Sequence, residues 1–371
     1  MPPTVSLIQL QEVASELGLE LGVSSAPPGP EAGRLKDWLA EGRHGEMGWL
    51  ERDPDRRADP RRVIEGARTV VSVAQNYFQG FIAPPGDGRP RGRIARYALG
   101  ADYHDVLLVK LRKLTTLLGD ELARPYVDTG PVLEKPRAMR AGLGWVGKHT
   151  NAVSRRLGSW WFIGSVITRT EIEPAGTHED HCGTCVACLE SCPTGAIHPD
   201  RPYELDSRLC ISYLTIEQRG PIPRPLRSLI GTWIYGCDIC LDVCPWNRFA
   251  EPTAEVRYQA RPELVEPSLE EMLGWDQATF SRIMKGSPIK RTKRRGLLRN
   301  VAVALGNAGD RGAIPALGRC LAEEVEPLVR GHAAWALGQL GGPAALAALE
   351  QARGDEDAFV REEVEAALGA R

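Results

Sequence analysis

Apolar residues recur at two different spacings in the first part of the chain. From Val5 to Leu21 they follow the spacing of a helix, and a second helix is expected to hold Leu35, Trp38 and Leu39. From Thr69 to Ala74 the chain instead has a continuous run rich in β-branched residues, which is typical of a buried strand. The pattern therefore predicts two helices followed by a strand.

The same mixture continues to residue 168. Asp102 precedes a stretch of helical spacing and is expected to cap that helix. Tyr126–Pro131 predicts a strand that ends in a tight turn, and Ser159–Thr168 predicts a hydrophobic strand. Helices and strands in alternation predict an α/β domain over residues 1–175.

The carboxy-terminal part carries an imperfect repeat. Val329–Gly338 recurs as Leu297–Gly306 and as Val360–Gly369, with offsets of roughly 31 to 32 residues. This period is near that of HEAT-like helical pairs, which stack and bury the small and aliphatic face of each neighbour. We expect an all-helical scaffold over residues 251–371.

Length and composition limit the class of protein. The chain has 371 residues, of which 43% are hydrophobic and 25% charged, so two or three ordinary globular domains are expected. No apolar run approaches the length that crosses a bilayer. Met1–Leu21 lacks the basic flank and apolar core of a signal peptide, so we expect a cytoplasmic protein without a membrane segment.

The net charge of −2 hides a local excess of positive charge. No acid occurs between Gln277 and Gly309, where eight lysines and arginines fall. Such a run is often only a solvated surface, but this many cations without an acid favour a phosphate-binding face. Five of them stand close together at the entrance to the repeats: Lys290, Arg291, Lys293, Arg294 and Arg295.

Cysteine spacing carries the most specific chemistry in the chain. Cys182, Cys185, Cys188 and Cys192 precede Pro193, and this spacing matches an iron–sulfur run whose fourth cysteine serves a second cluster. A second group precedes Pro245, and one cysteine stands between the groups. By the crossing rule one [4Fe–4S] cluster takes Cys182, Cys185, Cys188 and Cys244, and the other takes Cys192, Cys210, Cys237 and Cys240. We expect both clusters in a ferredoxin-like module over residues 176–250.

Zinc and disulfides are the alternatives for these thiols. Structural zinc would need separate Cys-x-x-Cys pairs, whereas three cysteines crowd into residues 182–188. Disulfides need an oxidising compartment, which the amino terminus does not suggest. Cys320 lies in an apolar helical pattern and is interpreted as a small buried core residue.

Several polar and glycine-rich segments admit both a structural and a functional interpretation. Asp128 at a strand end either exchanges a proton with a pocket or caps the following helix. Arg57 lies in an arginine-rich loop that is either solvated or a donor set for an anionic or amide-bearing ligand. The glycines of Ala141–His149 indicate close approach by a flat ligand or by another chain segment. Tyr97, Tyr103 and Trp145 either stack on a base or pack in the core.

The order of motifs resembles the epoxyqueuosine reductase family. The motifs are Arg96-Tyr-Ala-Leu-Gly-Ala-Asp-Tyr-His104, Val127-Asp-Thr-Gly130, Ala141-Gly-Leu-Gly-Trp-Val-Gly-Lys148, the two cysteine groups and the repeats. The resemblance covers nearly the whole chain. It implies reduction of epoxyqueuosine to queuosine at the wobble position of tRNA, the last step of queuosine biosynthesis. It also implies a base-off cob(II)alamin cofactor beside two [4Fe–4S] clusters.

The resemblance also implies roles for individual residues. Asp128 matches the proton donor. Tyr97, Tyr103 and His104 match a pocket motif, and His149 departs from the asparagine expected after Gly-Lys. The remaining matches are corrinoid contacts at Arg57, Ala95, Ala152 and Ile163, and contacts near the second cluster at Ser212 and Asp238.

The implied partners are tRNAs for aspartate, asparagine, histidine and tyrosine, together with an unidentified electron donor, and the protein is expected to be a monomer. The basic run Lys290–Arg295 would grip the tRNA stem.

The implied chemistry is consistent with the residues. Removing an epoxide oxygen takes two electrons and protons, and clusters with potentials down to about −700 mV can pass electrons singly. The chain has no Asp-x-His-x-x-Gly motif to supply a lower ligand to cobalt. Our hypothesis is that a reduced cobalt centre attacks the epoxide-bearing ring while Asp128 protonates the oxygen. The alternatives are a soluble corrinoid reductive dehalogenase acting on a small molecule and a non-enzymatic electron carrier.

Overall fold

The computed structural model describes residues 5–80, 82–83, 88–174 and 176–369. The chain divides into two compact units. The first comprises Met1–Phe81, Gly100–Ser207 and Asp238–Gln259, and the second comprises Ile82–Leu99, Arg208–Cys237 and Ala260–Arg371. The expected domains 1–175, 176–250 and 251–371 stay a prediction, and their end residues 1, 175 and 371 lie outside the described residues.

An antiparallel sheet forms the centre of the first unit. Its four strands run in the order β1 (Glu20–Ser25), β2 (Thr69–Asn76), β7 (Trp161–Thr168) and β4 (Arg124–Tyr126). Strands β2 and β7 pair along their whole length, from Thr69 opposite Thr168 to Asn76 opposite Trp161. Both are buried almost throughout, so apolar residues occupy both faces of each strand, and polar residues within them, such as Ser72 and Ser165, are buried as well.

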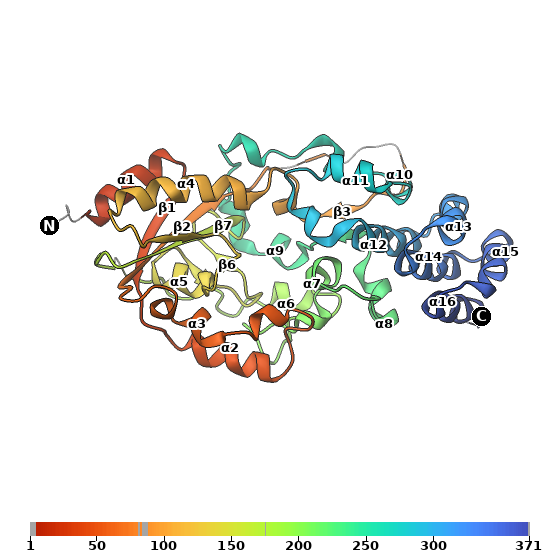
Figure 1. The fold of residues 1–371 in the computed structure, drawn as a ribbon, viewed down its shortest axis with the longest axis horizontal. Helices are drawn as coiled ribbons and strands as arrows, with labels where there is room; N and C mark the ends of the chain where they lie inside the picture. The colour runs from red at the N-terminus through yellow and green to blue at the C-terminus, as the bar shows by residue number, and fades with distance from the viewer. Residues whose placement is uncertain (1–4, 81, 84–87, 175, 370–371) are drawn as a thin grey trace. The chain divides into compact units, whose positions relative to one another are not determined.

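Helices cover both faces of this sheet. Helices α1 (Leu7–Glu16) and α4 (Tyr103–Leu117) lie on one face and α5 (Glu134–Arg140) on the other (Figure 1). Gly164 of β7 lets α4 approach closely, because a Cβ there would lie 2.9 Å from the side chain of Leu111. Gly22 of β1 allows a close approach on the other face of the sheet, because a Cβ there would lie 1.9 Å from the carbonyl oxygen of Ala141, which follows α5.

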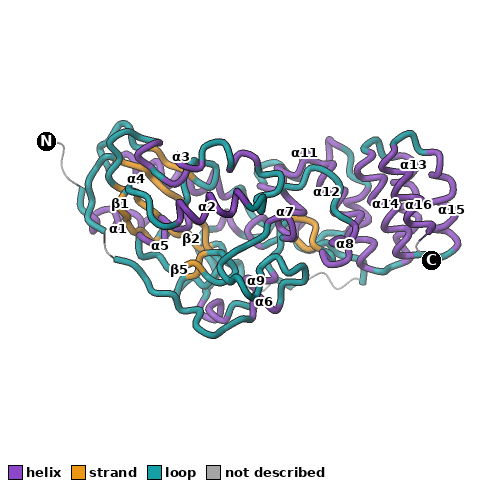
Figure 2. Tube along the Cα trace, turned by 90° about the horizontal axis from the view of Figure 1, so that it is seen from below, coloured by secondary structure: helices purple, strands orange, loops and turns teal. Residues whose placement is uncertain are grey.

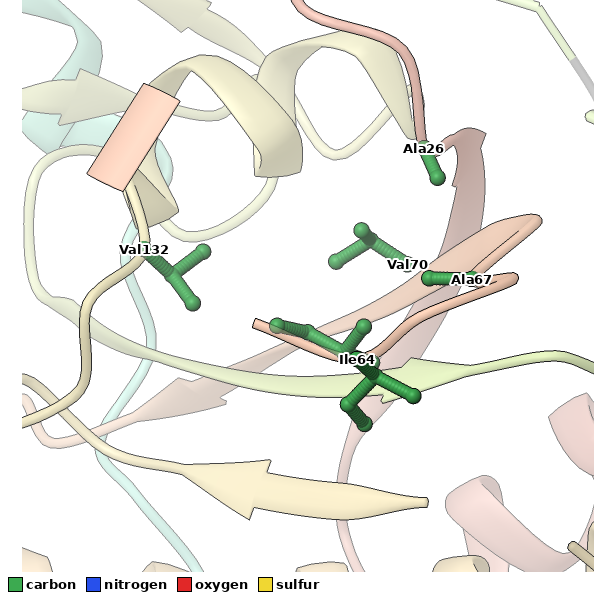
Figure 3. Close-up of a cluster of buried hydrophobic side chains, with 6 residues drawn as sticks. Ala26, Ile64, Ala67, Val70 and Val132 are labelled. Atoms are coloured by element: carbon green, nitrogen blue, oxygen red, sulfur yellow. The ribbon is translucent and has the colours of Figure 1, made fainter. Parts of the chain in front are cut away.

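A compact apolar cluster lies where the sheet meets the segment before β2 (Figure 3). Val70 of β2 and Ile167 of β7 are register partners, so their side chains lie on the same face of the sheet. The cluster residues are Ala26, Ile64, Ala67, Val70, Val132 and Ile167.

Shorter elements complete the first unit. They are α2 (Glu31–Ala40), α3 (Pro54–Ala58), β5 (Trp145–Val146), β6 (Ala152–Val153), α6 (Ala187–Glu190), α9 (Ile239–Asp242), and the 3₁₀ helices Gly48–Leu50, Pro60–Arg62, Pro245–Phe249 and Val256–Tyr258. Another 3₁₀ turn, Ser207–Leu209, stands where the chain passes from one unit to the other.

The second unit is mostly helical. Its two short strands, β3 (Arg93–Ile94) and β8 (Trp233–Tyr235), pair in parallel. Its α-helices are α7 (Ile211–Ile216), α8 (Arg224–Arg227), α10 (Leu269–Leu273), α11 (Gln277–Ile283), α12 (Lys293–Ala308), α13 (Ile314–Glu323), α14 (Pro327–Leu340), α15 (Pro343–Gln351) and α16 (Ala358–Gly369). Its 3₁₀ helices are Arg96–Ala98, Ser228–Ile230, Pro262–Leu264, Pro288–Thr292, Arg311–Ala313 and Ala352–Gly354.

The three sequence repeats fall on α12, α14 and α16, which stack with α13 and α15 as layered helices (Figure 2). A glycine recurs near the end of each repeat. A Cβ on Gly306 would lie 2.9 Å from the ring of Trp335, and one on Gly338 would lie 2.8 Å from Cβ of Ala367. The repeated glycine thus lets neighbouring helices approach closely, and the expected HEAT-like stack is confirmed.

The sequence prediction for the first helix was too long. Helix α1 ends at Glu16, and Gly18 has a φ of 70°, so the chain leaves the helix there and enters β1 at Glu20. Leu19, in the turn before β1, and Leu21, in β1, continued the apolar pattern because both side chains are buried, although neither residue is helical. Among the described residues, we find no helix with both the length and the apolar character needed to cross a membrane.

Candidate active site and iron–sulfur site

Asp128 occupies a tight turn between β4 and α5. Its φ of 57° lies in the left-handed region, which aspartate adopts more readily than most residues. A Cβ on Gly130 would lie 2.3 Å from the ring of Tyr126, so the turn requires glycine at that position. Leu133, not Asp128, is the N-cap residue of α5. The Asp128 side chain is 69% exposed, so the turn presents a carboxylate rather than capping a helix.

Tyr103 and His104, from the start of α4, contact this carboxylate. The Tyr103 hydroxyl donates to Oδ2 of Asp128 at 2.8 Å, and Nε2 of His104 lies 3.8 Å from the same oxygen. The Tyr103 ring stacks on Phe162 of β7, with 4.4 Å between ring centroids. The structure thus brings together the turn aspartate and two residues of the pocket motif, and the Tyr103 ring is engaged in stacking within the protein.

His104 is held between two carboxylates. Its Nδ1 lies 2.7 Å from Oδ1 of Asp102, which also caps α4 by accepting the backbone N–H of His104 at 3.1 Å. Burial lowers the pKa of His104, but hydrogen bonds and charges from Asp102 and Asp128 outweigh it and raise the pKa to about 9. At neutral pH the ring is therefore cationic.

The pKa of Asp128 is shifted in the opposite direction. Protein atoms around the exposed carboxylate displace part of its hydration and raise this pKa, but hydrogen bonds from His104 and Tyr103 and the charges of His104 and Lys135 outweigh this effect and hold it below the usual value. Asp128 is therefore a carboxylate at neutral pH, next to an imidazolium.

Glu134 supports the turn from the start of α5. The backbone N–H of Asp128 donates to its Oε2 at 2.8 Å, while its Oε1 is buried and has no hydrogen-bond partner among the described residues. Burial and the charge of Asp128 raise the pKa of Glu134 to about 8, so this carboxyl group is mostly protonated at neutral pH. We did not single out Glu134 from sequence, because an acid in the first turn of a helix is commonplace. The sequence feature that could have identified Glu134 is its position six residues after Asp128, just beyond the turn.

Arg57 also supports the turn. It lies in α3 rather than in a solvated loop, and its Nη1 donates to the carbonyl oxygen of Gly130 at 3.0 Å. Burial lowers its pKa, while the charges of Asp128 and Glu134 raise it. The structure therefore places Arg57 beside the Asp128 turn, and its role toward a corrinoid stays a prediction.

The other expected ring contacts lie in two regions. Ala152 and Ile163 share one apolar cluster, and Ile163 is only half-buried although its neighbours in β7 are buried. Ala95 and Tyr97 belong to the second unit, where Ala95 donates its backbone N–H to Tyr235 and the ring of Tyr97 lies 6.0 Å from that of Tyr235. The cluster around Ile163 contains Ala74, Ala138, Leu143, Ala152 and Trp161.

The glycine-rich run makes room for other parts of the chain. A Cβ on Gly142 would lie 2.8 Å from the carbonyl oxygen of Gly176, and one on Gly144 would lie 2.0 Å from that of Val153. Trp145 is 3% exposed and meets Trp246 edge to face at 5.0 Å between ring centroids. At these positions the second sequence interpretation, close approach by a chain segment, is correct, and the ring of Trp145 packs in the core.

Four cysteines line one small pocket of about 50 Å³ in the first unit. Three come from the first cysteine group, around α6, and the fourth directly precedes Pro245. They are Cys182, Cys185, Cys188 and Cys244, the set expected for the first cluster. Four thiols around one pocket are the donor set that a [4Fe–4S] cluster takes.

Two residues of the glycine-rich run lie against this pocket. Lys148 donates through Nζ to the carbonyl oxygens of Gly183 and Cys185, at 2.7 and 2.9 Å, and so fastens the loop that carries the cysteines. His149 lines the pocket and is 3% exposed. Burial lowers the pKa of His149 to about 4, with a smaller effect from Lys135, so the ring that departs from the expected asparagine is neutral.

The second cysteine set is distributed over both units. Cys192 follows α6 and Cys240 lies in α9, both in the first unit, whereas Cys210 precedes α7 and Cys237 follows β8 in the second. The two expected neighbours of this cluster are likewise divided, because Ser212 lies in α7 and Asp238 is the buried N-cap residue of α9. The membership of this set stays a prediction.

In the folded protein, two arginines of the basic run lie against carboxylates from other parts of the chain. Arg291 forms a two-point ion pair with Glu217, at 2.6 and 3.0 Å, and Arg294 pairs with Glu324 and donates to the carbonyl oxygen of Trp275. The other three cations, Lys290, Lys293 and Arg295, are exposed and form no ion pair within the described part of the chain. Of the five cations in the basic run, these three therefore lack a carboxylate partner among the residues that the structure describes.

Comparisons with known proteins agree with these features. The family model described as "4Fe-4S double cluster binding domain" matches residues 181–247, and that described as "HEAT repeats" matches residues 292–369. A third, "Epoxyqueuosine reductase QueG, DUF1730", matches residues 57–129, which include Arg57, Tyr103 and Asp128. Fold, thiols and repeats thus define an iron–sulfur protein with two [4Fe–4S] clusters, an α/β domain and a helical repeat region.

Individual related proteins identify the family more specifically than these family models. Epoxyqueuosine reductases of Xanthomonas campestris pv. campestris and Escherichia coli K12 are each 40% identical to the chain over 91% of it, covering 97% and 92% of their own lengths. A crystal structure of epoxyqueuosine reductase with an epoxyqueuosine-modified tRNA-Tyr stem loop superposes with a TM-score of 0.91 at 31% identity, covering 97% of both chains. That of Streptococcus thermophilus gives 0.89 at 29% identity, covering 98% of both. The chain belongs to the epoxyqueuosine reductase family.

Proposed function

We propose that this protein reduces epoxyqueuosine to queuosine at the wobble position of tRNA, with cobalamin and two [4Fe–4S] clusters. The observation that carries the proposal is the exposed Asp128 carboxylate, contacted by Tyr103 and His104. It lies in a chain whose fold matches an epoxyqueuosine reductase solved with an epoxyqueuosine-modified tRNA stem loop. Family membership favours this substrate over the small halogenated molecule of the dehalogenase alternative.

The residues present fit the proposed cofactors. Four thiols around one pocket suit the first cluster. Ala152 and half-buried Ile163 form an apolar surface that suits the face of a macrocycle. When bound, cobalamin supplies low-potential cobalt chemistry, and the clusters deliver its electrons singly.

The protein's own residues would manage the protons. Loss of an epoxide oxygen as water consumes two electrons and two protons. At neutral pH the protons near the turn reside on His104 and Glu134, whereas Asp128 is the exposed group. We therefore propose that His104 first passes its proton to the Asp128 carboxylate, across the 3.8 Å between Nε2 and Oδ2, and that Asp128 then delivers this proton to the departing oxygen. Tyr103 fixes the orientation of the carboxylate.

The remaining parts would bind the large substrate and the clusters. Residues 1–175 would form the cobalamin-binding catalytic domain, 176–250 the cluster module and 251–371 the tRNA-binding repeats. The exposed cations Lys290, Lys293 and Arg295 would contact phosphates of the tRNA stem. The tRNAs for aspartate, asparagine, histidine and tyrosine are the expected substrates, and the electron donor is a separate protein or reductant.

The test is direct conversion of the modified nucleoside. Anaerobically reconstituted protein with cobalamin and a chemical reductant is incubated with tRNA that contains epoxyqueuosine, and digested nucleosides are analysed by mass spectrometry. We expect the nucleoside to lose the mass of one oxygen only when cobalamin is present. No conversion with both clusters and cobalamin verified in place would refute the proposal.

A further inference from the structure

His149 keeps one ring nitrogen engaged within its own loop. Its Nδ1 accepts the backbone N–H of Asn151 at 3.2 Å. A ring nitrogen that accepts a hydrogen bond carries no proton, so the ring proton is on Nε2. The tautomer is thus set by the backbone, and Nε2–H is a donor of fixed direction.

That donor has no acceptor in the protein. Nε2 is buried and lacks a hydrogen-bond partner among the described residues, which is costly for a polar group. Gly147 leaves room for the ring at this place, because a Cβ there would lie 3.0 Å from Cε1 and 3.1 Å from Nε2 of His149. His149 is also one of the residues that line the pocket with Cys182, Cys185, Cys188 and Cys244. A buried donor without a partner therefore belongs to a residue of the four-thiol pocket.

We propose that Nε2–H of His149 donates a hydrogen bond to a sulfur of the first [4Fe–4S] cluster and thereby raises the reduction potential of that cluster. This inference rests on the cysteine set given above under the proposed function. Reduction adds one electron to the cluster, and a donor to sulfur stabilises the added negative charge. His149 is in this sense a positioning and tuning residue, since it touches neither substrate nor reacting atoms.

The first experiment compares midpoint potentials in the protein with both clusters. His149→Leu removes the donor and keeps an apolar side chain of moderate size in the buried position. An EPR-monitored redox titration should show one cluster with a lower potential and the other unchanged. We expect a roughly three- to tenfold less favourable reduction equilibrium, where tenfold corresponds to about 59 mV for one electron.

His181 provides the matched control. It lines the same pocket and Arg155 donates to its Nε2 at 2.8 Å, so its ring proton is on Nδ1. Unlike His149, it is only half-buried, and neither of its ring nitrogens is a buried atom without a partner among the described residues. His181→Leu should change the midpoint potential of either cluster by much less than His149→Leu changes that of the first cluster. Equal shifts in the two variants would mean that polarity around the pocket, and not one hydrogen bond, sets the potential, and would overturn the proposal.

A second measurement needs no change at residue 149. In wild-type protein labelled with ¹⁵N-histidine, pulsed EPR of the reduced clusters should detect a histidine nitrogen coupled to one of them, and His181→Leu should retain the signal. Absence of that coupling overturns the hydrogen bond even if His149→Leu loses its cluster. Wild-type protein without the iron of two clusters would instead refute the proposed cysteine sets, and this inference with them.

Discussion

The hydroxyl of Tyr103 donates a hydrogen bond of 2.8 Å to the carboxylate of Asp128. The two residues come from different elements, the first turn of α4 and the turn after β4. Because Phe162 and His104 stack on either side of the Tyr103 ring, the hydroxyl has little freedom to move away. The orientation of the exposed carboxylate is therefore set by the folded sheet and helix.

Replacing Asp128 with asparagine should remove the proton donor and little else. The amide has the same shape and is still able to meet the Tyr103 hydroxyl, but it cannot transfer a proton. We expect single-turnover conversion of epoxyqueuosine to slow by roughly 10²- to 10⁴-fold, the usual contribution of a general acid. The absorption spectrum of bound cobalamin should be unchanged, and mass spectrometry of the nucleosides measures the rate.

Tyr103→Phe should have a smaller effect than Asp128→Asn, because it leaves the carboxylate in place. It removes one hydrogen bond to a charged group while the ring still stacks on Phe162. The rate should fall by only about tenfold. If Asp128→Asn turned over normally with cobalamin bound, or if Tyr103→Phe were the slower of the two, the assignment of the proton to Asp128 would be wrong.

His104 should make the thermal stability depend on alkaline pH. Its pKa is raised from 6.5 to about 9, so the folded state holds its proton more tightly than the unfolded state. The resulting stability is fully present below pH 6.5 and is lost as pH rises through about 9. In His104→Gln the part of the decline in apparent Tm that falls in this window should disappear. Superimposable pH profiles of the two proteins would contradict the raised pKa.

Glu134 should add a second decline in thermal stability, at a lower pH than the decline due to His104. Its pKa is raised from 4.5 to about 8, so its contribution is present below pH 4.5 and is lost as pH rises through about 8. Glu134→Gln resembles the protonated form and keeps an acceptor for the backbone N–H of Asp128. The variant should therefore match wild type at about pH 5 and have a higher apparent Tm at about pH 8 to 9. A lower Tm at the alkaline end would show that Glu134 works as a carboxylate.

Local sequence patterns predicted the parts of this protein that depend on spacing. Asp102 caps α4 and the repeats became stacked helices, because each is encoded by a short period or a neighbouring residue. The four cysteines of the first set line one pocket, and their role as ligands of one cluster stays a prediction. Cys320 is a buried residue of α13, as interpreted, and burial raises the pKa of its thiol to about 12.

Long-range partners could not be predicted in this way. Arg291 meets Glu217, which lies 74 residues earlier in the chain, and Arg294 meets Glu324 at the end of the next helix of the stack. The absence of acids from this stretch of sequence therefore did not predict which carboxylates lie beside it in the folded protein. The glycines of the run after α5 posed the same problem, because only the fold reveals that Val153 and Gly176 approach them.

The Arg294–Glu324 pair should contribute to stability rather than to RNA binding. Its side chains are 14% and 8% exposed, and Arg294 also holds the carbonyl oxygen of Trp275. Arg294→Gln would leave a mostly buried carboxylate without its partner, at a cost on the order of 3 kcal/mol. We expect a lower apparent Tm, partly restored in the double variant Arg294→Gln with Glu324→Gln. Equal Tm values for wild type and Arg294→Gln would contradict this.

The three unpaired cations of the basic run should bind RNA phosphates. Changing Lys290, Lys293 and Arg295 together to glutamate should weaken binding of the tRNA and flatten its dependence on salt, by about one unit of slope for each phosphate that is no longer bound. Fluorescence anisotropy with labelled tRNA at several salt concentrations measures both quantities. Arg291→Gln is the matched control, because that side chain is already paired with Glu217 and should change the slope much less. Equal affinity of the triple variant and wild type at moderate salt would place the tRNA elsewhere on the protein.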